Sequence, residues 1–385
     1  MNNKPMYVQL LGVGLPNRGA ELMARTIIEK FDAKYSNCIY CIDQKIPESD
    51  RENLSLKKLR PYVVRPFFSR PFFSKPFLSR PFKSGKYKKP AKDCPLINQE
   101  KVDVVIDISG FAYGDFWKSP KAKKRLFDLL PLWRAKKTPL FIMPQALGPF
   151  SDPDFQTYLK PCFDYAKIVC PRDQQSLAYA KEIGGVDFTL SSDITFSLQE
   201  GHDPRPEDCK EEYSLIIPNS KIIASGTLDK GSYIQLVIAV IKKFSSLGKT
   251  VYMLNHEGEN DLKLCLEIGE LTNVETINPI DAIEIKQRIA GAELVFTSRF
   301  HGLISSLATG TPPIVFGWSH KYKEVLKEFG LSRHLIQNHS NESLQLIDDL
   351  YDQNYRETVR LKIEARNKEV QTQLDELWLD VFSNI

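Results

Sequence analysis

The sequence contains no apolar run of about 18 residues, the length that a helix needs to cross a bilayer. Its amino end lacks a basic segment followed by an apolar stretch, so we expect no signal peptide. The seven cysteines are odd in number and scattered, which argues against a disulfide framework and favours a reducing compartment. These absences predict a cytoplasmic protein.

Acidic residues are missing from one segment, residues 57–92, which holds twelve Lys or Arg and no Asp or Glu. The whole chain has 52 basic and 48 acidic residues, so the rest has 40 and 48, a net charge of −8. The basic character is therefore local. Nucleic acid is not an expected partner, because the rest of the chain is acidic and contains no recognition motif.

The basic segment also contains the one clear repeat, in which Arg-Pro-Phe or Lys-Pro-Phe recurs every five residues from Arg65 to Lys83. A proline in every unit prevents a continuous helix, so we expect an extended or irregular excursion from the first domain. Cations beside phenylalanines predict contact with an anionic membrane surface, at the inner face of the cell membrane. The alternative is that the phenylalanines pack on the protein itself, as a lid over the cleft.

Short apolar segments alternate with segments of helical periodicity along most of the chain. Strands that are buried on both faces and separated by helices are typical of parallel sheets built from βαβ units. The predicted fold class is α/β, with two Rossmann-like domains facing a cleft. One of the expected helices spans residues 120–136.

The expected domain organisation has four parts. An N-terminal domain spans residues 1–198, and a polar linker follows at residues 199–212. A C-terminal domain spans residues 213–340, and the amphipathic tail at residues 341–385 is expected to be helical and to pack back on the domains. Two such domains place the carboxyl ends of their strands on the shared cleft.

Glycine and polar residues cluster where the expected strands end. Gly12 and Gly14 precede Asn17 at a helix start, which suits either an anion site or a plain tight turn. Asp107 and Gln145 end two further strands. The Gln145 amide suits a sugar hydroxyl or a turn equally.

Arg172 ends another expected strand, just before a helix. It is suited either to an anion in the cleft or to a carboxylate of the protein.

The most informative turn is Ser298-Arg299-Phe300-His301, between an apolar strand and a helix, with Lys321 shortly beyond it. Arginine at such a place suits bidentate contact with a carboxylate or phosphate. The helix N-terminus disfavours the charged form of His301, and a bound anion reverses that preference. The competing interpretation is a structural histidine with an arginine salt bridge.

Several of these turns together resemble the polysaccharide pyruvyl transferase family. They are Asn17-Arg18-Gly19-Ala20-Glu21, Cys170-Pro171-Arg172-Asp173, Ser192-Asp193, Ser298-Arg299-Phe300-His301 and Gly310-Thr311-Pro312-Pro313. The resemblance implies the two-domain architecture of GT-B glycosyltransferases. It also implies an enzyme that transfers pyruvate from phosphoenolpyruvate to a sugar of a surface polysaccharide or its lipid-linked precursor, forming a pyruvate ketal and releasing phosphate.

The resemblance further implies roles for individual residues. Arg172, Ser298, Arg299 and Lys321 would bind phosphoenolpyruvate, with His301 and Arg299 acting in catalysis. Acceptor contacts are expected from Asn17, Asp107, Gln145 and Asp193.

Two other function classes fit the same pattern. A sugar-nucleotide-dependent glycosyltransferase of this architecture would place Arg299 and His301 against a diphosphate, and a non-catalytic glycan-binding protein would keep only the fold. We expect no cofactor and no metal, because the turns show no His, Asp and Glu cluster with ligand spacing. The His256-Glu257 pair is interpreted as a loop feature.

Overall fold

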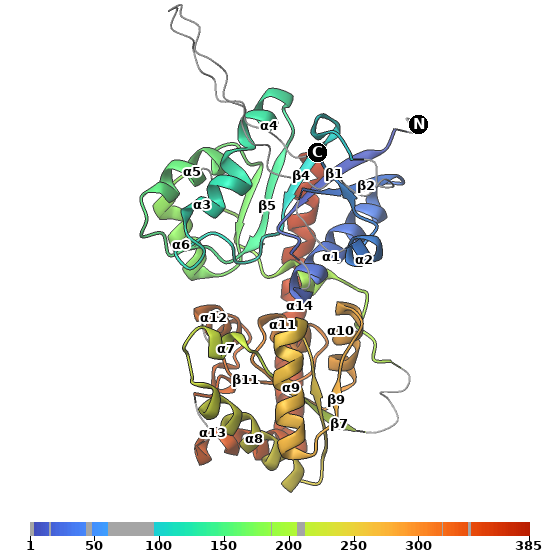
Figure 1. Ribbon diagram of the computed structural model, residues 1–385, viewed down its shortest axis with the longest axis vertical. Coiled ribbons are helices and arrows are strands. Elements are labelled where there is room, and N and C mark those ends of the chain that lie inside the picture. Colours follow the sequence, from blue (N-terminus) through green and yellow to red (C-terminus); the bar gives the residue numbers. More distant parts are fainter. Residues whose placement is uncertain are drawn as a thin grey trace, which may run out of the picture.

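The computed structural model describes residues 4–14, 17–43, 48–60, 96–185, 187–205, 212–317, 319–337 and 340–385. They form two α/β domains stacked end to end (Figure 1). The predicted class, with two Rossmann-like domains, is therefore confirmed. Beyond Arg60, the predicted Arg-Pro-Phe excursion lies outside the described residues.

The N-terminal domain has a parallel sheet of six strands in the order β3-β2-β1-β4-β5-β6. The strands are β1 Met6–Leu11, β2 Cys38–Ile42, β3 Lys57–Lys58, β4 Val104–Asp107, β5 Leu140–Gln145 and β6 Ile168–Pro171. The helices of this half are α1 Arg18–Lys34, α2 Glu48–Asn53, α3 Ser119–Ala122, α4 Leu130–Lys136, α5 Asp154–Phe163 and α6 Gln174–Ile183. Strands β4 and β5 are buried along their whole length, as a sheet covered on both faces requires.

The C-terminal domain has a parallel sheet of five strands in the order β11-β10-β7-β8-β9. The strands are β7 Tyr213–Ile217, β8 Thr250–Leu254, β9 Thr276–Ile277, β10 Leu294–Thr297 and β11 Pro313–Val315. The helices are α7 Lys221–Ala224, α8 Lys230–Ser246, α9 Gly258–Thr272, α10 Ala282–Gly291, α11 Phe300–Ala308, α12 His320–Glu328 and α13 Asn341–Tyr351.

The strand orders locate the binding region of each domain. The order reverses between β1 and β4 in the first sheet and between β7 and β10 in the second. At such a switch point the loops leave toward opposite faces and open a crevice at the carboxyl ends of the strands. The turn that begins at Ser298 follows β10, so it lies at the second switch point.

The helix expected at residues 120–136 is interrupted. The structure has α3, then a π-helical turn at Lys123–Phe127, and then α4, which starts at Leu130. Pro131 lies in the first turn of α4. Because proline has no N–H to donate, it fits the start of a helix and not its middle, which explains the break.

The carboxyl-terminal segment forms one long helix, α14 Gln353–Ser383, that passes along both domains (Figure 1). On the C-terminal domain, Asn367 donates its side-chain N–H to the Leu307 carbonyl at 2.8 Å. On the N-terminal domain, Gln371 donates to the Phe196 carbonyl at 2.6 Å, and the Phe382 ring contacts Phe31 at 5.4 Å between centroids. The helix therefore holds the two domains at one relative position.

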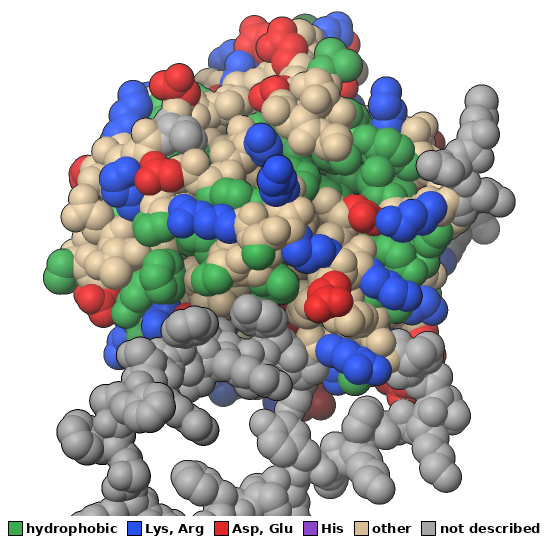
Figure 2. Space-filling view, turned by 90° about the horizontal axis from the view of Figure 1, so that it is seen from above, with side chains coloured by type: hydrophobic (Ala, Val, Ile, Leu, Met, Phe, Trp, Pro, Cys, Tyr) green, Lys and Arg blue, Asp and Glu red, His purple; other side chains and the backbone are tan. Residues whose placement is uncertain are grey.

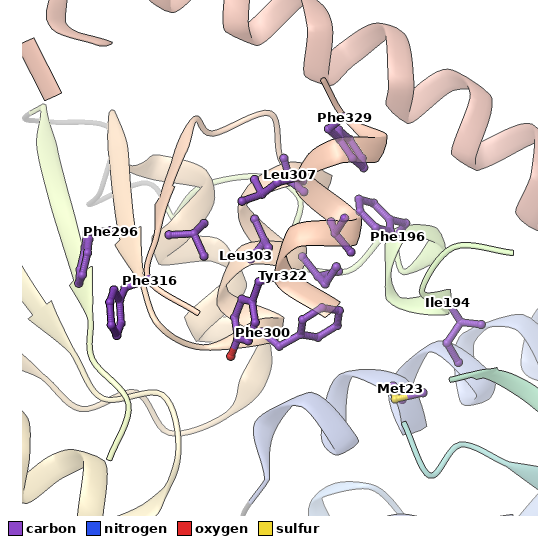
Figure 3. Packing of buried hydrophobic residues seen from close by; sticks show 14 of the residues in the cluster. Met23, Ile194, Phe196, Phe296, Phe300, Leu303, Leu307, Phe316, Tyr322 and Phe329 are labelled. Carbon is purple, nitrogen blue, oxygen red and sulfur yellow. The ribbon is translucent and has the colours of Figure 1, made fainter. Parts of the chain in front are cut away.

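Apolar side chains also pack where the two domains meet. Helix α11 carries Phe300 and Leu303 into a cluster with Tyr322 of α12 (Figure 3). The Phe196 ring, from the segment that joins the domains, stacks on Phe329 with centroids 5.6 Å apart. This core fixes the turn before α11 from behind.

On the end of the N-terminal domain shown in Figure 2, basic and acidic side chains are interspersed. Within the described ranges, no helix combines the length and the apolar character that crossing a bilayer requires.

Candidate functional site

A cavity of about 380 Å³ lies between the domains at the two switch points. Glu257 is its one lining carboxylate among the described residues, against six basic side chains: Lys121, Arg125, Arg172, Lys221, Arg299 and Lys321. His256 and His301 also line it. Basic side chains therefore outnumber acidic ones in this lining, which favours an anionic ligand.

The turn after β10 is held rigidly by backbone and side-chain hydrogen bonds. The Ser298 carbonyl accepts from the Asn219 amide at 2.8 Å and from the Tyr322 hydroxyl at 2.9 Å. The Ser298 hydroxyl accepts from Tyr233 at 2.9 Å. Ser298 is fully buried and does not line the cavity, so in this structure it supports the turn and does not face a ligand.

Arg299 is tied to carboxylates of the protein. Its guanidinium lies 2.5 Å from the buried Asp261 carboxylate and 2.6 Å from Glu257. Burial disfavours the charged guanidinium, but the two carboxylates outweigh that effect and raise the pKa of Arg299. Arg299 lines the cavity in this arrangement, and its charge is balanced by Asp261, which does not line the cavity, and by Glu257, which does.

Arg172 and His301 share one carboxylate across the domain boundary. Arg172 donates to Asp193 at 2.9 Å, and His301 Nε2 lies 3.7 Å from the same oxygen. The Arg172 guanidinium also lies over the Phe300 ring at 4.2 Å. Asp193 does not line the cavity, so it positions the cation and the imidazole and does not face the cleft.

His301 is neutral in this structure near pH 7. Burial lowers the pKa of His301 to about 4, and the charges of Arg172 and Lys321 contribute in the same direction against Asp193. His301 lies in the first turn of α11 and packs on Gly19 in the first turn of α1. Two helix N-termini therefore oppose the imidazolium in the same place, and both favour a bound anion.

Gly19 offers a test of this contact. A Cβ added at Gly19 would lie 2.0 Å from His301 Nδ1, closer than any real contact. We expect Gly19→Ala to displace the imidazole and lower catalytic turnover by about 100-fold or more, comparable to loss of an acid–base group. Steady-state kinetics measures this.

The matched control is Gly231→Ala in the first turn of α8, where the added carbon meets only Asp229 Oδ1, at 3.3 Å. Equal activity of Gly19→Ala and Gly231→Ala would show that the position of His301 does not matter.

Lys321 lies beside the same aromatic ring. Its ammonium is 4.8 Å from the centroid of Phe300 and 5.3 Å from that of Phe111. Burial, with the charges of Arg172 and Arg299, lowers the pKa of Lys321 to about 7. Bound anions would favour its charged form.

Of the four residues expected to bind the acceptor, only Asn17 lines the cavity. Its side chain also caps α1 by accepting from the Ala20 N–H at 3.0 Å. Asp107 is fully buried, accepts from the Tyr113 hydroxyl at 2.8 Å and faces Gln145. In this structure Asp107 at the end of β4, Gln145 at the end of β5 and Asp193 at the start of a 3-10 turn are therefore buried residues that do not line the cavity.

The sequence interpretation missed His256 and Glu257 as members of the site. They do lie in a loop, as expected, but it follows β8 and opens on the cavity. His256 is buried with no hydrogen-bond partner on either ring nitrogen, and burial holds its pKa well below the ordinary value. Their place at the end of a predicted strand was the signal that could have found them.

In the described parts of the chain, no group of three His, Cys, Asp or Glu side chains converges to hold a metal ion. The expectation of metal-independent chemistry stays a prediction.

Comparison with known proteins identifies the family. The model of the polysaccharide pyruvyl transferase family matches residues 17–320, which include the turns after β6 and β10. The chain belongs to the polysaccharide pyruvyl transferase family. This match confirms the resemblance inferred from the sequence. The members of this family are transferases. No curated protein gave a significant match to the chain.

Solved structures agree with the architecture. A putative UDP-N-acetylglucosamine 2-epimerase from Listeria monocytogenes has a TM-score of 0.60 at 11% identity, covering 99% of this chain and 96% of that one. The Neisseria meningitidis UDP-GlcNAc 2-epimerase bound to UDP-GlcNAc has a TM-score of 0.57 at 9% identity, with coverages of 98% and 99%. The pneumococcal O-GlcNAc transferase GtfA in complex with UDP and GlcNAc has a TM-score of 0.52 at 12% identity, with coverages of 100% and 99%. These similarities establish the GT-B-like fold.

Proposed function

We propose that this transferase moves pyruvate from phosphoenolpyruvate onto a sugar of a surface polysaccharide or its lipid-linked precursor. The observation that carries the proposal is the convergence of three basic groups on one ring. Arg172, Lys321 and His301 lie 4.2, 4.8 and 5.5 Å from the Phe300 ring centroid, at the edge of a cationic cavity. A small donor with both a carboxylate and a phosphate matches such a cluster.

The reaction needs one proton at carbon and two sugar hydroxyls. Protonation of the methylene carbon of phosphoenolpyruvate gives the adjacent carbon oxocarbenium character, and the first hydroxyl adds there. The bond to phosphate then breaks, and the second hydroxyl closes the ketal. Of the two protons that the hydroxyls lose, one balances the new methyl group and the other leaves with phosphate.

His301 is the group that we assign to proton transfer. It is neutral before the donor binds, since its pKa is about 4. Carboxylate and phosphate beside it would offset the charges of Arg172 and Lys321 and so raise its pKa toward the ordinary range. Donor binding thereby favours the protonated form of His301, which then protonates the donor.

Lys321 makes donor binding depend on pH. Because its pKa is about 7, Lys321 loses its charge as pH rises through that value. We expect the Kd for phosphoenolpyruvate, measured by titration calorimetry, to rise above about pH 7 in the native enzyme and to stay level there in Lys321→Arg, because guanidinium remains charged.

The control for this pH profile is Lys323→Arg, an exposed position on the same helix. If the native enzyme and Lys321→Arg have the same profile, Lys321 does not control donor binding.

Phosphate release tests the function itself. The purified chain would be incubated with phosphoenolpyruvate and a panel of glycans, with phosphate measured against a sample without glycan. A parallel arm replaces phosphoenolpyruvate with UDP-GlcNAc. Release of UDP in that arm and no phosphate in the first would make the chain a glycosyltransferase. No product in either arm would favour a glycan-binding protein.

A peripheral position at the membrane stays part of the proposal. It rests on the twelve cations of residues 57–92, which attract an anionic surface. Co-sedimentation with anionic vesicles at low and high salt tests it, and indifference to such vesicles would contradict it.

A further inference from the structure

The loop after β4 places a row of aromatic side chains along the N-terminal wall of the cavity. Phe111 stacks on Phe116 with centroids 6.5 Å apart, and Phe116 meets the Trp117 ring edge-on at 4.9 Å. Phe116 and Trp117 are 54% and 39% exposed, although all three rings line the cavity. Large aromatic side chains left open to solvent inside a polar cavity mark a binding surface.

The row connects two basic regions. At its inner end the Lys321 ammonium lies 5.3 Å from the Phe111 ring, next to the proposed donor site. At its outer end the Lys121 ammonium lies 3.6 Å from the Trp117 ring. Arg125 lines the same wall and donates to the Ser109 hydroxyl at 2.8 Å. The wall thus has cations of its own, apart from those assigned to the donor.

In the part of the chain that the structure describes, no salt bridge holds Lys121 or Arg125. Burial raises the pKa of Asp43 and of Asp107, and the charge of Arg125 acts to lower both values. Neither carboxyl group lines the cavity. A half-buried cation that faces a cavity is stabilised by an anion in that cavity.

The loop is also held in a fixed shape. The Asp115 N–H donates to the Pro149 carbonyl at 2.9 Å, and the Ser151 N–H donates to the Asp115 carboxylate at 2.9 Å. Lys118, directly after Trp117, has a φ of 63°, a strained conformation for a residue with a side chain. Strain of this kind persists where the surroundings enforce it and is frequent at ligand sites.

We propose that this aromatic row, Phe111, Phe116 and Trp117, binds the acceptor sugar ring, and that Lys121 and Arg125 bind an anionic group attached next to it. The acceptor is thus a charged saccharide. Its anion is either a phosphate at the sugar's linkage, as in a lipid-linked precursor, or the carboxylate of a neighbouring uronic acid. The inference rests on the proposed function, because it takes the inner end of the row as the donor site.

The first experiment measures binding in the absence of phosphoenolpyruvate. The probes are a neutral methyl hexoside, the corresponding hexose 1-phosphate and the corresponding methyl hexuronide, each in the gluco and galacto series, and titration calorimetry gives each Kd. We expect a charged probe to bind about tenfold or more tightly than the neutral one, as a charge-assisted hydrogen bond implies. The tighter of the two charged probes identifies the anion.

Variants separate the ring from the charge. Lys121→Gln should weaken the preference for charged probes, because only Arg125 is then left to bind the anion, and should leave the Kd of the neutral hexoside unchanged. Trp117→Ala should weaken every probe about tenfold, and Trp117→Phe should restore part of that loss, as stacking on an aromatic ring requires. Lys160→Gln, at an exposed ion pair on α5, is the matched control and should behave as the native chain. Circular dichroism confirms that each variant is folded.

Opposite results would overturn the inference. It fails if charged and neutral probes bind alike, if none of them binds, or if Lys121→Gln keeps the preference undiminished. If Trp117→Ala releases phosphate from phosphoenolpyruvate as fast as the native chain, the acceptor subsite is contradicted and the proposed function is supported. If charged probes bind in a way that depends on Trp117 and Lys121, but no glycan gives phosphate release, the subsite is supported and the donor assignment is contradicted.

Discussion

We expect His301→Ala to lower kcat by about 100- to 10,000-fold, the range typical of general acid–base catalysis. The KM for phosphoenolpyruvate should change much less, because Arg172 and Lys321 stay in place beside Phe300. Asp193 keeps its contact with Arg172 at 2.9 Å, so the carboxylate is not left alone. The measurement is steady-state kinetics with the donor varied at saturating acceptor.

The pH profile distinguishes proton transfer from a merely structural role. In the native enzyme, kcat should fall at high pH, above the donor-raised pKa of His301, because only the imidazolium can protonate carbon. His301→Ala should lack that limb, and so should His301→Gln, which keeps a similar volume and hydrogen-bonding ability. Near-normal turnover of His301→Ala across the pH range would mean that another group transfers the proton.

The second large effect is on stability. We expect Arg299→Ala to lower the free energy of unfolding by about 3–5 kcal/mol, the cost of breaking a buried ion pair by removing one partner. The Asp261 side chain is 0% exposed and lies 2.5 Å from the guanidinium. Without Arg299, this buried carboxylate would lose its ion-pair partner.

A double substitution separates folding from donor binding. Arg299→Ala with Asp261→Asn removes both charges, while an amide oxygen can still accept from the Ser220 N–H, now 3.0 Å from Asp261. We expect this variant to recover much of the lost stability and still to need more phosphoenolpyruvate, since a charged hydrogen bond is worth about 1.5–3 kcal/mol. Urea unfolding and donor KM are the two measurements. Equal stability of Arg299→Ala and the native chain would contradict the ion-pair argument.

The alternation of strands and helices was predictable because it is a local property. Apolar segments such as Val104–Asp107 and Leu294–Thr297 are short, continuous and followed by turn residues, and both proved to be central strands. The helix at residues 120–136 was predicted too long, because the periodicity hid the effect of Pro131. The strand-end rule drew attention to Arg172, Arg299 and His301, which line one cavity, and Lys321, added by the family resemblance, lines the same cavity.

The sequence by itself determined two α/β domains and the turns that form the site, since strand periodicity and strand ends depend on neighbouring residues. Only the tertiary structure decided which charges pair. Asp193 forms an ion pair with Arg172, and Asp261 forms one with Arg299. Gly19 packs against His301 across the domain boundary. The first two pairs each lie within one domain, 21 and 38 residues apart in the chain, and meet through the packing of that domain. The contact of Gly19 with His301 joins the two domains and depends on α14 and the core around Phe196, which fix the domains together. Contacts of this kind depend on how whole domains pack, which no local pattern records.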